Sequence, residues 1–317
     1  MFLRVITCAL LSPAFAFGAG HPLELPTVLQ GALDALRNGH YLQTLETARG
    51  LQETFPGHPL PYLIQAEANW GLIFCQTGHI SSREIWNAAD EKSSSFDRDF
   101  FQAVDETIAV SEALREEPKS AALGAFYEGL AHGVRARLHT LRAEALNSGK
   151  AGKQMRESLL QAAAQDPALQ ADAEAGLGVY NYYADVLSPL IKLFRFLLLI
   201  PGGDREKGLE QLRAASLQAT LLLPEARNEL ARIYSLRENR PAAALPLFRS
   251  LADRYPQNAI YALSAAIQAE RIGEKEIAAD YVRKALGAVK EMDDVCRDRL
   301  EPASQQALER LQGKPGR

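Results

Sequence analysis

Apolar residues recur at helical spacing along most of the chain, and short polar or proline-containing segments interrupt them. This pattern predicts amphipathic helices over residues 61–76, 101–116, 121–146 and 154–165. Residues 77–99, which contain three consecutive serines, predict a longer connection.

Composition favours the same interpretation. The chain has 50 Ala and 46 Leu, which favour helices, against only 32 Val, Ile and Thr residues in total, which favour strands. We therefore expect an all-α protein, and not a β-sandwich, a barrel or a Rossmann sheet. The net charge of −4 leaves no basic surface of the kind that nucleic-acid partners require.

The segment 1–19 has the order of a secretory signal peptide. Arg4 precedes an apolar run over residues 5–17, and small residues suit cleavage after Ala16 or Ala19. A buried N-terminal helix is the alternative. The run is too short to span a bilayer comfortably, so we expect an exported protein, periplasmic or secreted, with no transmembrane span in the mature chain.

Three cysteines bear on the compartment and on the fold. Cys8 leaves with the signal peptide, so Cys75 and Cys296 remain. They lie far apart in the sequence, and a bridge would require an elongated array to close on itself. We therefore expect two free, buried thiols, with a single intramolecular bridge as the less favoured alternative.

An internal repeat is clearest between residues 224 and 290. The matching pairs are Arg237 and Arg271, Phe248 and Val282, Leu251 and Ala285, and Tyr255 and Val289. With its constant offset and its small, aromatic and terminal-proline positions, this unit resembles the tetratricopeptide repeat (TPR) family. The resemblance implies antiparallel helix pairs that stack into a right-handed solenoid.

The repeat pattern divides the chain into five regions. These are a signal peptide (1–19), an N-terminal TPR-like region (20–120), degenerate or expanded repeats (121–209), C-terminal TPR repeats (210–292), and a C-terminal helix with a tail (293–317). The half-motif from Arg37 to Pro56 has the same spacing as the one from Arg237 to Pro256.

The middle of the chain departs from the repeat. An apolar helix is expected over residues 189–199, and its length of about 16 Å is half of what a bilayer span needs. Its charges, Lys192 and Arg195, share one narrow face and are candidates for contacting a partner or ligand. A core helix is the favoured interpretation, and an interfacial helix or the wall of an apolar ligand cavity are alternatives.

Residues 187–209 are also distantly similar to the eukaryotic inclusion-body-clearance family of TPR proteins, through Gly203-Asp204-Arg205 and Gly208-Leu209. No function is transferred from that family. Three nearby tyrosines are candidates for lining a pocket, although packing between helices is the favoured role: Tyr180, Tyr182 and Tyr183.

The sequence contains no phosphate-binding loop, dinucleotide fingerprint, zinc-protease motif or serine-hydrolase motif. Glu128, His132 and His139 fall along one helical face, but the histidines are two turns apart, about 10 Å, too far to share a metal. We therefore expect neither an enzyme nor a bound cofactor or metal.

The TPR resemblance implies a scaffold or adaptor that binds a protein or peptide on its concave surface. By the same resemblance, Asn228 and Arg232 are the candidate groove residues of the best unit. Two alternatives stay open. One is a periplasmic carrier or transporter-associated protein that binds an apolar small molecule or lipid, and the other is an uncharacterised enzyme.

Overall fold

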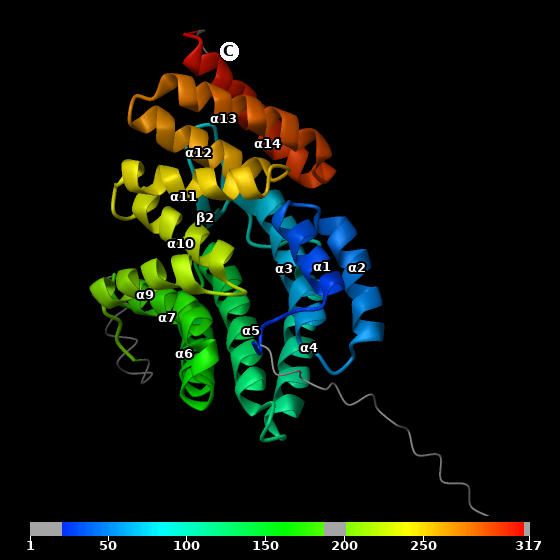
Figure 1. Ribbon diagram of the computed structural model, residues 1–317. Helices are drawn as coiled ribbons and strands as arrows, with labels where there is room; N and C mark the ends of the chain where they lie inside the picture. The colour runs from blue at the N-terminus through cyan, green and yellow to red at the C-terminus, as the bar shows by residue number, and fades with distance from the viewer. Residues whose placement is uncertain (1–20, 187–200, 314–317) are drawn as a thin grey trace, which may run out of the picture.

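The computed structural model describes residues 21–186 and 201–313, which form 13 α-helices and one short β-hairpin. Successive helices pack as antiparallel pairs, so the all-α class expected from the composition is confirmed (Figure 1). The helices are α1 (Thr27–Arg37), α2 (Tyr41–Thr54), α3 (Leu60–Thr77), α4 (Asp97–Arg115), α5 (Ala121–Leu141), α6 (Ala145–Gln165), α7 (Gln170–Asp185), α9 (Arg205–Gln218), α10 (Leu223–Leu236), α11 (Pro241–Arg254), α12 (Ala259–Arg271), α13 (Lys275–Ala288) and α14 (Asp294–Leu311).

Three expected features lie outside the described residues. They are the signal peptide over 1–19, the apolar helix over 189–199 with Lys192 and Arg195, and the last part of the C-terminal tail. None of the described helices combines the length and the apolar character that crossing a lipid bilayer requires.

The turns between paired helices repeat in conformation as well as in sequence. Asn239 and Gly273, which occupy the same position in successive repeats, both have positive φ, at 49° and 85°. Gly39 in the turn between α1 and α2 also has a φ of 85°. This left-handed conformation favours glycine and asparagine, which explains why these residues occupy the turns.

One predicted helix is wrong at its C-terminal end. The sequence predicts a helix over 121–146, but α5 ends at Leu141 and α6 begins at Ala145. Ala143 takes a positive φ of 58°, and the Glu144 carboxylate accepts a hydrogen bond from His139 Nδ1 at 2.6 Å across the turn. Because every residue at this turn is an adequate helix former, the apolar period carries no stop signal there.

The connection expected over 77–99 contains regular structure. Strands β1 (Gly78–Ile80) and β2 (Ile85–Ala89) pair in an antiparallel hairpin in which Ile80 lies opposite Ile85. Two arginines of α14 hold this hairpin. Arg299 donates to the carbonyls of Gln76 and Gly78 at 2.8 and 2.9 Å, and Arg310 donates to the carbonyl of Ser82 at 2.6 Å.

The two ends of the array meet, which corrects the expectation of free thiols. Helix α14 packs against α3 and β1 (Figure 1), and Cys75 of α3 forms a disulfide with Cys296 of α14. Their Cα atoms are 4.7 Å apart although 221 positions separate them in the sequence. The expectation failed because it assumed an elongated solenoid, whereas this array closes on itself.

Candidate binding site

A cavity of about 440 Å³ lies where the closed array brings α3, α10, α12 and the β-hairpin together. Its wall consists of Tyr41, Trp70, Phe74, Arg83, Glu84, Ile85, Asn228, Arg232, Ser235, Leu236, Asn239, Phe248, Asn258, Ile260, Tyr261, Ser264, Ile267, Gln268 and Arg271. Its volume falls within the range of small-molecule sites, about 300–1,000 Å³. We call it the concave cavity, because it lies on the inner side of the closed array.

Helical periodicity explains which side chains reach the concave cavity. The α10 residues in its wall are Asn228, Arg232, Ser235 and Leu236, which recur at intervals of three and four and therefore share one face. Helix α12 contributes a similar stripe that includes Ser264 and Gln268. The structure thus places the two candidate groove residues, Asn228 and Arg232, together in this wall.

The wall of the concave cavity contains more positively than negatively charged side chains. It contains three arginines, Arg83, Arg232 and Arg271, and one carboxylate, Glu84. Arg271 donates hydrogen bonds to neutral acceptors on three residues, Ser235, Gln268 and Asn239. The cavity therefore has a local excess of positive charge in a chain whose net charge is −4.

Arg232 is held beside the cavity with unused donors. Its side chain is only 14% exposed, and its Nε is buried without a hydrogen bond to any described residue. It forms an ion pair with Glu229, whose Oε2 lies 3.8 Å from Nε, beyond hydrogen-bond distance. Over residues 21–186 and 201–313, neither terminal nitrogen of this guanidinium donates a hydrogen bond.

Aromatic side chains form the part of the wall that α3 contributes. Trp70 and Phe74 of α3 stack with ring centroids 5.3 Å apart, and the guanidinium of Arg137 lies 3.9 Å from the centroid of the Trp70 ring. Arg137 is in turn paired with Glu67. Burial raises the pKa of the phenol of Tyr261, so this wall residue is uncharged at neutral pH.

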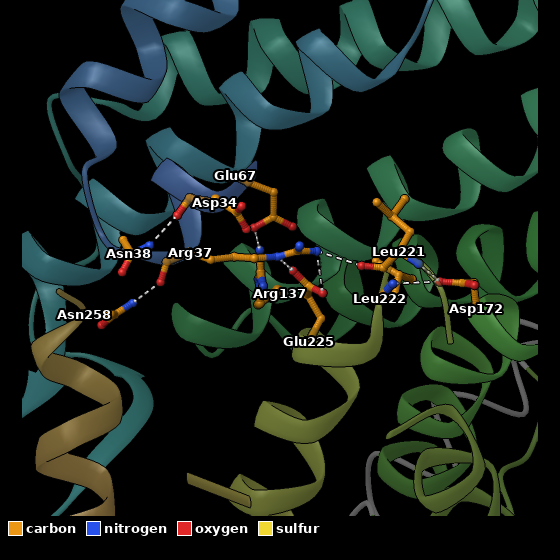
Figure 2. Close-up of polar contacts among 10 residues, drawn as sticks. All are labelled: Asp34, Arg37, Asn38, Glu67, Arg137, Asp172, Leu221, Leu222, Glu225 and Asn258. Carbon is orange, nitrogen blue, oxygen red and sulfur yellow. Dashed lines mark hydrogen bonds and ion pairs between the residues drawn. The ribbon is translucent and has the colours of Figure 1, made fainter. Parts of the chain in front are cut away.

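A polar network beside the cavity fixes the N-terminal helices against the C-terminal half (Figure 2). Arg37 at the end of α1 donates to both carboxylate oxygens of Glu225, at 2.9 and 3.1 Å, and to the carbonyl of Leu221 at 2.7 Å. The Asn258 amide donates to the carbonyl of Arg37 at 2.9 Å. Asp172 in turn accepts from three successive backbone N–H groups, which include that of Leu221.

The three candidate tyrosines support the helices and do not line the concave cavity. The hydroxyl of Tyr180 donates to the carbonyl of Pro201 at 2.7 Å, and that of Tyr182 donates to Glu238 at 2.5 Å. Tyr183 donates to Glu229 at 2.8 Å, and so orients the carboxylate that lies nearest to Arg232. Their contribution to the site is therefore indirect.

A second cavity of about 660 Å³ lies between α1 and helices α10 and α11. Two of its three arginines already have protein acceptors, and the third, Arg254, lies 5.9 Å from the centroid of the Tyr255 ring. Arg37 binds Glu225 and Leu221, and Arg227 donates to the carbonyl of Ser216 at 2.9 Å. We therefore take the concave cavity, where Arg232 has unused donors, as the candidate site.

Most residues of this wall could not be identified as site residues from the sequence. Trp70, Phe74 and the hairpin residues 83–85 belong to a different repeat from Asn228, and only closure of the array brings them together. Arg271 carried a signal, since it occupies the position of Arg237 one repeat later, but the repeat alone does not distinguish a site residue from a turn residue.

Over the part of the chain that the structure describes, no group of three or more His, Cys, Asp or Glu side chains is arranged to hold a metal ion. Comparison with models of known protein families finds no match, and comparison with curated proteins finds no relative. The functional assignment therefore depends on the geometry and chemistry of the concave cavity.

Proposed function

We propose that this protein is an exported, TPR-like binding protein that docks a segment of a protein or peptide partner in the concave cavity. The observation that supports this most directly is the position of Asn228 and Arg232. Both lie in the wall of the cavity, on the one face of α10 that points to the interior of the array.

The size of the concave cavity limits what it holds. At about 440 Å³ it accommodates a few side chains and not a whole helix. Because α14 packs against α3, the described part of the array is closed and not extended. We therefore propose that a short end or loop of the partner enters the cavity, while the rest of the partner contacts the rim.

Export is part of the same proposal. Structural disulfides persist in oxidising compartments and are rare in the cytosol, and Cys75 and Cys296 form one in this protein. The charged start, apolar run and small residues of segment 1–19 support the same location.

A second candidate function is a carrier of a small molecule. The volume of the concave cavity, where α3, α12 and the hairpin meet, favours it, because it falls within the range of small-molecule sites. The wall is more cationic than a wholly apolar ligand requires, so this candidate is a carrier of ligands that include a polar or anionic group.

The test is to isolate residues 20–317 from the envelope of the native host and to identify what accompanies them by pull-down and native mass spectrometry. Asn228→Trp fills the concave cavity and should remove the bound partner or ligand. The matched control is Asn147→Trp, which makes the same change at an exposed position of α6 outside the cavity wall.

A co-isolated protein that is lost in N228W and kept in N147W supports the docking function. A bound small molecule with the same dependence supports the carrier. The proposal is wrong if both variants retain the same partners as the wild-type protein, because occupation of the cavity would then not matter.

A further inference from the structure

We propose that the concave cavity selects ligands in which an anionic group, such as a carboxylate, sulfonate or phosphate, is attached to an apolar body. This inference rests on the proposed binding function and specifies the chemistry of what enters the cavity. It is carried by the imbalance of charge in the wall and by the unused donors of Arg232.

The charge of the wall is opposite in sign to that of the whole protein. Three arginines and one glutamate line the cavity, while the complete chain has a net charge of −4. Within a partly enclosed site, water screens charge less effectively than it does at an open surface. Cationic ligands are therefore disfavoured and anionic ligands are attracted.

Arg232 supplies the specific contact. An arginine side chain that is 14% exposed has lost much of its hydration, and its nearest carboxylate oxygen is 3.8 Å from Nε. Such a guanidinium gains most from an oxyanion, which can accept two parallel N–H donors in a planar geometry. An anionic ligand would thus provide a close hydrogen-bond acceptor, which Glu229, the ion-pair partner of Arg232 at 3.8 Å, does not supply.

The two carboxylates near the cavity do not replace that ligand. Glu229 accepts a hydrogen bond from Tyr183, which directs it toward α7. Glu84 lies on the hairpin, where its side chain is 49% exposed and its Oε1 lies 3.7 Å from Nε2 of His79. Neither forms a hydrogen bond with Arg232.

The apolar body is inferred from the aromatic and aliphatic residues of the wall. Trp70 and Phe74 present a stacked pair, and Phe248 and Ile267 add apolar surface from α11 and α12. A ligand with only an anionic group would leave this surface in contact with water. A ligand that carries an aromatic or aliphatic part covers it and gains affinity from the area removed from water.

Two fluorescent probes with one skeleton test the assignment directly. 8-Anilinonaphthalene-1-sulfonate carries an anionic group, and N-phenyl-1-naphthylamine is the same skeleton without it. The protein is the chain over residues 20–317, with the disulfide intact, and calorimetric titration measures each affinity. We expect the sulfonate probe to bind at least tenfold more tightly than the neutral probe.

Variants then locate the anionic group. Arg232→Gln keeps a polar side chain of similar reach and should weaken the sulfonate probe by about tenfold or more, because hydrogen bonds to charged groups are the strong ones. The neutral probe should change by less than about twofold. Its retained affinity also reports that the variant is folded.

Two further variants complete the design. Asn228→Asp adds a negative charge to the same face of α10 and should also weaken the sulfonate probe selectively. Arg283→Gln removes a positive charge from an exposed pair with Asp280 on α13, outside the cavity wall, and should change neither affinity.

Three outcomes would overturn the inference. They are equal affinity for the two probes, equal effects of R232Q and R283Q, or no binding of either probe. If the two probes bind the wild-type protein equally well and both lose binding in N228W, the anion assignment is refuted, but a ligand in the cavity is still supported. The proposed function fails separately, if N228W retains the partners of the wild-type protein.

Discussion

Single polar residues inside this protein differ in how well they are paired. The Asp172 carboxylate accepts three backbone hydrogen bonds at 2.7–2.8 Å, so its burial is compensated. His132 is only 4% exposed, and its Nδ1 has no hydrogen-bond partner among the described residues. Incompletely paired groups of this kind determine how the protein responds to acid.

Two buried histidines should destabilise the protein as the pH falls. Burial lowers the pKa of His58 and of His132 to about 4, although Glu128 and Asp105 oppose this for His132 and Arg135 reinforces it. Their ordinary pKa is 6.5. Between about pH 6.5 and 4 the unfolded chain binds protons that the folded protein does not, so the free energy of unfolding declines over that window.

Each histidine contributes a slope of at most about 1.4 kcal/mol per pH unit. In the wild-type protein, His58 Nδ1 accepts a hydrogen bond from the N–H of Leu60 at 3.1 Å. In His58→Asn, the asparagine side-chain oxygen can accept the same hydrogen bond. Between pH 6.5 and 4, we expect the free energy of unfolding to decline less steeply in H58N and in His132→Asn than in the wild-type protein. Urea unfolding at a series of pH values measures it, and identical slopes would contradict the assignment.

Phe248 links the core to the concave cavity. It is 4% exposed, and it occupies the aromatic position of the repeat unit. We expect Phe248→Ala to lower the free energy of unfolding by about 3 kcal/mol, at the low end for phenylalanine because one side already borders a cavity.

The control for Phe248 is Leu217→Ala, at a leucine that is 73% exposed, which should change stability by less than about 0.5 kcal/mol. Reversible urea unfolding compares the two. A loss below about 1 kcal/mol in F248A would mean that the repeat register is misread.

Among the helices and strands, proline, glycine and capping residues determined which boundaries could be predicted from the sequence. Helices α3 and α4 lie within a few residues of the predicted 61–76 and 101–116. Asp204, which follows Pro201 and two glycines, caps α9 by accepting the N–H of Lys207 at 3.0 Å. The β-hairpin was not predictable, because its strands are stabilised by arginines more than 200 positions away.

Arg310 is the residue that fixes this hairpin to two helices. Its guanidinium binds both carboxylate oxygens of Glu270 at 2.7 Å and also the carbonyl and hydroxyl of Ser82. We expect Arg310→Ala to increase amide hydrogen exchange selectively over residues 78–89, because the hairpin loses both hydrogen bonds that hold its turn at Ser82. Global stability should fall by about 1–3 kcal/mol.

The control for Arg310 is Arg297→Ala on the same helix, because Arg297 pairs with Asp294 within α14. It should leave exchange in the hairpin unchanged. Equal exchange of the hairpin in R310A and the wild-type protein would show that α14 does not hold it.

At the scale of the whole molecule, closure of the array is what the sequence did not disclose. The repeat pattern describes contacts between neighbouring helices, whereas closure depends on contacts such as those of Arg37 with Glu225, 188 positions apart. For the same reason, the sequence indicated Asn228 and Arg232 but not the part of the wall that Trp70 and Phe74 form. A repeat specifies local packing, and the sum of many small rotations decides whether the ends meet.

Closure also determines how the Cys75–Cys296 disulfide stabilises the protein. The bridge joins positions 221 residues apart, so it restricts the unfolded chain strongly, by about 5 kcal/mol in the chain-entropy description. Other native contacts also cross the junction, since Arg299 donates hydrogen bonds to the carbonyls of Gln76 and Gly78. We therefore expect Cys75→Ala with Cys296→Ala to fold with unchanged helix content and probe binding, but to unfold at a markedly lower urea concentration.

A thiol reductant provides the matched comparison. It should lower the urea midpoint of the wild-type protein to nearly that of the double alanine variant and should leave the variant itself unchanged. Circular dichroism follows both transitions. Loss of helix content without urea on reduction would mean that the bridge creates the closed array, whereas an unchanged midpoint would mean that it adds nothing to stability. The expected result lies between these two. Packing of α14 on α3 closes the array, and the disulfide makes opening costly only when the whole chain unfolds.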